Sequence, residues 1–281
     1  MNFKIIILSI LFIVALGCSS KTPQTPKMPQ TPQTLQTLQT PQTSPTPLIP
    51  TLYRPLDFVD KAKLKTDEAY GDKTYFDLMF APIGWSKDGK FAYITGIYGG
   101  GAGNDETGYF RWVIQDMVTD KYLWQSERGL EEGLPMELRD SNKDTEIFKW
   151  VYSNLRVKYK EYLDKYGIII HTDLKVSSFP LEYNNNKYTA SIADISYGDM
   201  YGTPNIITKY KVLVNRNGIN KTFSEYKNQN DMFLNVQIGG YIKSPYEPRV
   251  ALVLSSVTRG WEGAPHPVKS SFVGCHLEIG Y

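Results

Sequence analysis

The sequence predicts a mainly β fold, in which antiparallel sheets with hairpins are joined by one amphipathic helix at about residues 144–166. Twenty Tyr and twelve Phe residues suit a pleated, half-buried surface better than a helical one. Short apolar runs separated by turn residues recur along the chain, as they do in all-β proteins. A single stretch departs from that pattern and repeats its apolar residues at helical spacing.

The expected strands are short and are separated by turns. Asp88-Gly89 and Asn217-Gly218 are dipeptides typical of tight hairpin turns. Strands are expected at 75–80, on both sides of the turn within 85–94, and at 109–116, 122–124, 168–176, 188–195, 206–215, 219–226, 232–242, 250–257 and 268–279. Runs of this length favour a largely antiparallel core.

The expected helix has one apolar side. Its apolar positions recur every three or four residues, at Ile147, Val151, Leu155, Tyr159, Tyr162 and Tyr166. Ser141 or Asp144 can cap its start, and Gly167 stands where a C-terminal cap belongs. We expect the apolar side to cover a sheet.

The first 17 residues have the parts of a secretory signal. Lys4 is followed by an apolar run from 5 to 16 that only Ser9 interrupts, and then by the small residue Gly17. The run is too short for a membrane span, which needs about 20 residues. We therefore expect residues 1–17 to be removed on export.

The exit from this segment reads Val-Ala-Leu-Gly-Cys18 and resembles the lipobox of bacterial lipoproteins. The resemblance implies cleavage after Gly17, a diacylglycerol thioether on Cys18 and acylation of the new N-terminus, for example with palmitate. Two or three acyl chains would anchor the protein stably to a membrane. Ser19, where an inner-membrane retention signal often has Asp, favours the outer membrane over the inner. The alternative is an ordinary signal peptide with a cysteine by chance.

Residues 18–51 are expected to form a disordered tether behind the lipidated cysteine. Between residues 21 and 50, 22 of 30 residues are Thr, Pro or Gln. Such a segment has little apolar surface to offset its ordering entropy. Extended, it would reach roughly 90 Å at ~3.1 Å per residue. Pro-x-x-Pro docking is an alternative, and O-glycosylation of its Thr residues is left open.

Residues 52–281 are expected to be a single β-rich globular domain. The formal charge of the whole chain is +2, and it becomes +1 when the signal segment removes Lys4. This balance gives no electrostatic case for binding nucleic acid. Cys275 would be the one thiol left in the domain, and we expect it to pack on a strand, with metal ligation beside His276 as the alternative.

Two stretches resemble TolB-type β-propeller blades. Trp-Ser-Lys-Asp-Gly-Lys-Phe-Ala-Tyr at 85–93 is similar to that family's strand-turn-strand signature, and the stretch from Ile114 to Tyr122 is similar to the next strand pair. A second, degenerate copy starts at Lys243. These motifs, followed by Arg-Gly-Trp-Glu-Gly at 259–263, also resemble a family of predicted secreted bacterial proteins of unknown function. The resemblance implies blade-like modules rather than a closed propeller, because a ~40–45-residue period is missing.

Catalytic and cofactor motifs are missing from the sequence, so no catalytic residue, metal ligand or cofactor is predicted. The chain has no G-x-S-x-G, H-E-x-x-H, G-x-x-x-x-G-K-[ST] or C-x-x-C motif. The glycine-rich run at 99–103 is followed by no Lys-Ser/Thr, so a hairpin loop explains it better than a phosphate loop. The acidic run at 140–146 has Thr145 where a calcium loop needs Gly.

The most site-like stretch is 259–267, where Gly and Pro stiffen a loop that holds Arg259, Trp261, Glu262 and His266. Trp261 could stack on a ring while Glu262 and His266 supply polar contacts. A structural turn anchored by Trp261 is the competing interpretation.

Together these features predict a membrane-anchored envelope lipoprotein with a non-catalytic binding domain. Its partner would be an envelope or host protein or a glycan, and its periplasmic or surface orientation is left open. The alternative is an envelope hydrolase that acts on glycan or ester substrates near the 259–267 loop.

Overall fold

The computed structural model describes residues 48–64, 75–97, 109–126, 135–138, 143–227, 231–260 and 265–281. Contacts divide the chain after Pro45, and every described residue belongs to the unit Thr46–Tyr281. Cys18 and the expected tether up to residue 47 lie outside the described residues. Ile49 already packs against a hydrophobic cluster of the domain, ahead of the boundary expected at residue 52.

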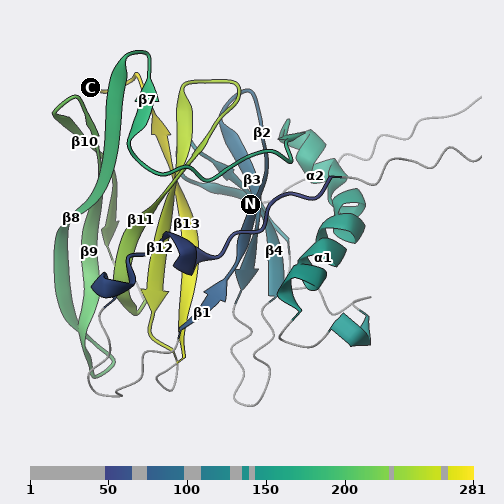
Figure 1. Cartoon of the computed structure of the whole chain (residues 1–281), viewed down its shortest axis with the longest axis horizontal. Coiled ribbons are helices and arrows are strands. Elements are labelled where there is room, and N and C mark those ends of the chain that lie inside the picture. The colour runs from purple at the N-terminus through teal and green to yellow at the C-terminus, as the bar shows by residue number, and fades with distance from the viewer. Residues whose placement is uncertain are drawn as a thin grey trace, which may run out of the picture. The chain divides into compact units, whose positions relative to one another are not determined.

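The domain is mainly β, as predicted, and consists of three sheets and one helical segment (Figure 1). Sheet A is fully antiparallel and has the order β5-β4-β3-β2-β6. Its strands are β2 (Phe80–Trp85), β3 (Lys90–Ile97), β4 (Tyr109–Asp116), β5 (Tyr122–Gln125) and β6 (Ile169–Ile170).

Sheet B has the order β1-β13-β12-β11, with β1 parallel to β13 and the other pairs antiparallel. Its strands are β1 (Tyr75–Leu78), β11 (Phe233–Lys243), β12 (Arg249–Thr258) and β13 (His266–His276). Sheet C is an antiparallel meander of order β10-β9-β8-β7. Its strands are β7 (Leu181–Tyr183), β8 (Asn186–Met200), β9 (Thr203–Arg216) and β10 (Ile219–Lys227).

The helix and the three sheets form successive layers, with sheet B between sheets A and C (Figure 1). Alternation along the strands builds this stack, because successive side chains of a strand point to opposite faces. In β3, the Ala92 side chain packs toward the helical segment, whereas the Tyr93 side chain packs toward sheet B. In β12, Val253 packs toward sheet A and Leu252 toward sheet C. Strand β12 therefore has no solvent face, which explains its unbroken apolar run from Val250 to Leu254.

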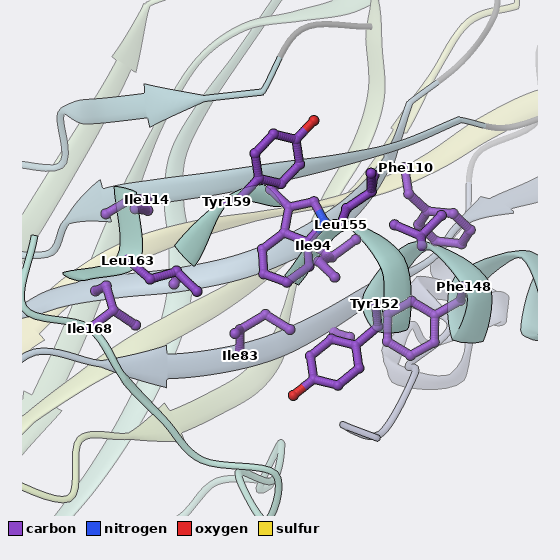
Figure 2. Close-up of a cluster of buried hydrophobic side chains, with 14 of the residues drawn as sticks. Ile83, Ile94, Phe110, Ile114, Phe148, Tyr152, Leu155, Tyr159, Leu163 and Ile168 are labelled. Carbon is purple, nitrogen blue, oxygen red and sulfur yellow. The ribbon is translucent and has the colours of Figure 1, made fainter. Parts of the chain in front are cut away.

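The helical segment is divided into α1 (Asp144–Lys158) and α2 (Lys160–Lys165), with a break at Tyr159. Its apolar side covers sheet A, as predicted, and Figure 2 shows its aromatic and aliphatic side chains over the isoleucines of the strands. Gly167, at φ +67°, ends the segment in the left-handed conformation that glycine adopts readily. The N-cap residue is Lys143, whose side chain makes no capping hydrogen bond; Asp144 is the first helical residue, and Ser141 lies outside the described residues.

Short 3₁₀ helices and connecting segments complete the described chain. They are η1 (Pro55–Phe58), η2 (Lys61–Lys63) and η3 (Met136–Leu138). The Asp60 backbone N–H donates to Gln237 Oε1 at 3.0 Å, and Ser177 forms an isolated antiparallel bridge with Tyr241. These contacts cover parts of the outer edge of β11, which limits pairing with another chain there.

The two blade-like stretches form hairpins whose turns lie side by side. In the β2–β3 turn, the Lys90 N–H donates to Ser86 Oγ at 2.7 Å, and Gly89 has φ +85°. In the β11–β12 turn, the Ser244 N–H donates to the Arg249 carbonyl at 2.9 Å. A Cβ on Gly89 would come within 3.2 Å of Arg249 Nε. The sheets stack in layers and do not close into a ring among the described residues.

Three strand predictions were wrong in extent. The expected strand 75–80 is split at Met79, because β1 joins sheet B and β2 joins sheet A. The expected strand 168–176 is a strand only at Ile169–Ile170. Sheet C contains a short strand, β7, that was not predicted, and β8 extends five residues beyond its expected end at 195.

Candidate functional site

The structure places the predicted 259–267 loop between β12 and β13. Trp261 and Glu262 lie outside the described residues. The Arg259 backbone N–H donates to the Met232 carbonyl at 2.8 Å, and this bond joins the start of the loop to the segment before β11. The Arg259 side chain is half-buried.

His266 is fully buried at the first position of β13. Its Nδ1 accepts a hydrogen bond from the Gly260 backbone N–H at 3.2 Å, across the neck of the loop. The Tyr75 ring lies 6.0 Å from the His266 ring, centroid to centroid. These contacts join Gly260 and Tyr75 to the start of β13, so His266 packs inside the domain and does not face solvent.

The two described ends of this loop nevertheless lie at the end of the sheets that carries an open recess. The start of β11 and the end of β12 lie at this same end, since Phe233 pairs with Thr258. In Figure 1, these strand ends lie with the end of β10 and the β8–β9 turn at the lower end of the sheets. Loops gathered at one end of stacked sheets are a common position for binding sites.

An open recess of about 540 Å³ lies at this end, lined by Glu225, Tyr226, Lys227 and Asp231. The first three are the last residues of β10, and Asp231 lies just before β11. Its volume falls within the roughly 300–1,000 Å³ that is usual for small-ligand sites. We refer to these four residues as the β10 recess.

Asp231 is held from two sides. The Tyr226 hydroxyl donates to Asp231 Oδ2 at 2.9 Å, and Lys269 Nζ lies 3.3 Å from Asp231 Oδ1. Lys269 belongs to β13 of sheet B, whereas Tyr226 belongs to sheet C. The carboxylate therefore ties the two sheets together at the edge of the recess.

One of the lining residues, Tyr226, packs against two other aromatic rings. The Tyr226 ring stacks on the Tyr210 ring with centroids 4.8 Å apart, and it lies 5.2 Å from the Phe233 ring. Burial, followed by the hydrogen bond to Asp231, raises the pKa of Tyr226 well above its usual value. Burial, together with the Asp231 charge, raises the pKa of Tyr210 to about 12. Both phenols therefore stay protonated to a higher pH than an exposed tyrosine would.

Glu225 is paired with a lysine on the neighbouring strand. Lys209 Nζ lies 2.8 Å from Glu225 Oε1, and this hydrogen bond is the main cause of a lowered pKa for Glu225. The residue is thus ionised and compensated. Because a general acid or base needs a pKa near the working pH, this chemistry suits static hydrogen bonding better than proton transfer.

A second polar cluster joins sheets A and B and was not anticipated. Arg249 Nε donates to Glu247 Oε1, and Arg249 Nη1 donates to the Met117 carbonyl, both at 2.8 Å. Asp120 Oδ1 accepts the Gly274 backbone N–H at 2.7 Å. Burial raises the pKa of Asp120 to about 6. The cluster fastens the β4–β5 turn to β12 and β13, which is a structural function.

The described ends of the predicted 259–267 loop lie at the same end of the sheets as the recess, but the recess itself was not predicted. The lining residues lie between 225 and 231, but their partners Lys209 and Lys269 are distant in sequence and are brought near by the pairing of β10 with β9 and the stacking of sheets B and C. A usable signal was the aromatic and charged end of the 219–226 strand beside the polar stretch that follows it.

Three further observations concern metal ligands, membrane spans and the thiol of Cys275. Among the described residues, no group of three or more His, Cys, Asp or Glu side chains is arranged to hold a metal ion. Within the same residues, no helix is both long and apolar enough to cross a membrane. Cys275 is a free, fully buried thiol between sheets B and C, in agreement with its predicted packing on a strand.

Comparison of the chain with protein-family models, with curated proteins and with solved structures gave no match.

Proposed function

We propose that this chain is a cell-envelope lipoprotein, anchored through lipid on Cys18, whose β-rich domain is a non-catalytic binding module that uses the β10 recess. The recess carries the proposal: it is an open hollow lined by four polar side chains at the loop end of the sheets. Ser19 after the lipid-bearing cysteine favours the outer membrane over the inner.

The arrangement of the recess favours binding over catalysis. Both of its carboxylates have lysine partners, Lys209 for Glu225 and Lys269 for Asp231. The Tyr226 hydroxyl is engaged as a donor to Asp231 Oδ2. Side chains held in this way present a pre-organised surface, which lowers the entropy lost when a ligand binds.

The anchoring part of the proposal is tested by Cys18→Ala. We expect this variant to leave the membrane fraction and to lose metabolic labelling by palmitate, since the thioether sulfur would be gone. Continued labelling and membrane retention would refute the lipid anchor.

The binding part is tested by crosslinking in intact cells. A photo-crosslinking residue at position 227 should give discrete adducts. The matched replacement of Lys187, an exposed lysine at the other end of sheet C, should give none. Equal crosslinking at the two positions, or none at position 227, would contradict a binding role for the recess.

A further inference from the structure

Strand β10 combines an unpaired edge with the recess described above. It is the last strand of sheet C and pairs with β9 alone among the described strands. In an antiparallel ladder, half of an edge strand's N–H and C=O groups point away from the sheet. Glu225, Tyr226 and Lys227 are consecutive on this edge, so the recess lies directly beside the strand backbone.

The part of β10 next to the recess has regular geometry. A register shift between Thr222 and Ser224 interrupts the strand's first half. From Ser224 to Lys227 the pairing with β9 continues without interruption, from Val212 to Lys209. A bulge protects an edge where it occurs, so the regular run at 224–227 is where another strand could pair.

Within the described part of the chain, Lys227 is the lysine of the recess that has no acidic partner. Glu225 pairs with Lys209, and Asp231 pairs with Lys269. Lys227 is exposed, and no ion pair joins it to an acid in the described part of the chain. Its charge contributes only a minor part of the lowered pKa of Glu225. The edge therefore offers a positive charge to an incoming ligand.

From these two observations we infer that the ligand of the β10 recess is an extended peptide segment with an acidic side chain, added as a strand to β10 at residues 224–227. Backbone hydrogen bonds to the open edge would hold the segment, and its carboxylate would pair with Lys227. This inference rests on the binding function proposed above. A glycan would use the recess side chains and would not need the strand edge.

The test uses the full chain, purified in detergent, and three synthetic probes of alternating Thr and Val. One probe has a central Glu, the second has Gln there, and the third has the Glu with N-methylated amides. The Glu peptide should bind about threefold more tightly than the Gln peptide, which is the size of one exposed ion pair. The N-methylated peptide should not bind, because it cannot complete the backbone ladder.

Protein variants separate the charge from the fold. Lys227→Gln should remove the preference for the Glu peptide, whereas Lys227→Arg and the control Lys187→Gln should keep it. Hydrogen exchange should slow at the amides of 224–227 when the Glu peptide is bound. Equal binding of the N-methylated peptide, or unchanged exchange at β10, would overturn the inference.

A glycan arm separates this inference from the proposed function. Binding of an oligosaccharide that protects Asp231 and not the β10 amides would refute the peptide ligand and leave the binding function standing. If neither peptides nor oligosaccharides bind, and crosslinking at position 227 also fails, both proposals fall.

Discussion

At the scale of single residues, Gly274 shows how closely sheets A and B approach each other. A Cβ at this position would lie 1.8 Å from the Met117 carbonyl oxygen, a distance that no packed structure tolerates. The contact involves backbone on both sides, so no side-chain rotation can relieve it. Gly274 therefore lets the β4–β5 turn rest on β13, where Asp120 accepts its N–H.

Gly274→Ala is expected to lower the free energy of unfolding by about 1–3 kcal/mol, the usual cost of overpacking. Urea denaturation of the full chain measures this. Gly198→Ala is the matched control, because its Cβ would meet only the Thr208 side chain, whose γ-carbon would lie 3.0 Å away. Equal effects of the two substitutions would show that the close approach at Gly274 is not present in solution.

Asp120 should make stability depend on pH. Its pKa is about 6 in the folded protein against an ordinary value of 3.8. Between pH 3.8 and pH 6 the folded state therefore binds more protons than the unfolded state. The stabilisation that protonated Asp120 gives the folded state is complete below about pH 3.8 and is lost as the pH rises through 6. Asp116 strengthens this shift, and Arg249 opposes it.

Asp120→Asn keeps an acceptor for the Gly274 N–H and removes the titration. Between pH 4.5 and pH 7.5, the free energy of unfolding of the variant should rise by about 1 kcal/mol relative to that of the wild type. The rise is smaller than a fully buried group would give, because solvent screens Asp120. Urea titrations at several pH values measure the difference. A constant difference across that range would contradict the raised pKa.

At the scale of elements, periodicity predicted the helix well because its apolar side packs on sheet A. The apolar positions Ile147, Val151 and Leu155 are all buried against sheet A. Periodicity could not show the break at Tyr159, since a change of helix axis leaves the three- and four-residue spacing intact. It also could not show that residues 171–176 leave the sheet, because their polar and apolar alternation continues after β6 ends.

The packing of α2 can be tested separately from that of α1. Leu163 is 2% exposed in the cluster over sheet A, whereas Val157, on α1, is 71% exposed. Leu163→Ala should destabilise the protein by about 2–3 kcal/mol through lost burial and a residual cavity. Val157→Ala should change stability by less than about 0.5 kcal/mol. Similar losses for both substitutions, measured by urea denaturation, would place α2 away from the sheet.

At the scale of the whole molecule, the three-sheet stack follows from strands with no solvent face. The run Val250 to Leu254 predicted a buried strand, but a sequence pattern does not tell which sheet covers each side. That arrangement depends on contacts between distant segments, such as Gln115 Nε2 donating to the Phe272 carbonyl at 3.0 Å.

The candidate site also depends on contacts between segments that are distant in sequence. Its four lining residues are close in sequence, but the partners that fix them, Lys209 and Lys269, come from β9 and β13. Sequence alone could point to the 259–267 loop, because Gly and Pro there mark a stiff turn. It could not show that His266 faces inward, or that the open surface lies beside β10.

The most direct test of a binding role for the β10 recess is hydrogen exchange of the full chain in isolated cell envelopes, compared with the purified chain in detergent. If the recess is occupied by a partner in the envelope, exchange should slow at residues 224–227 and 231 and stay unchanged at 182–187, at the other end of sheet C. Identical exchange at the recess in the two samples, or protection confined to another surface, would contradict it.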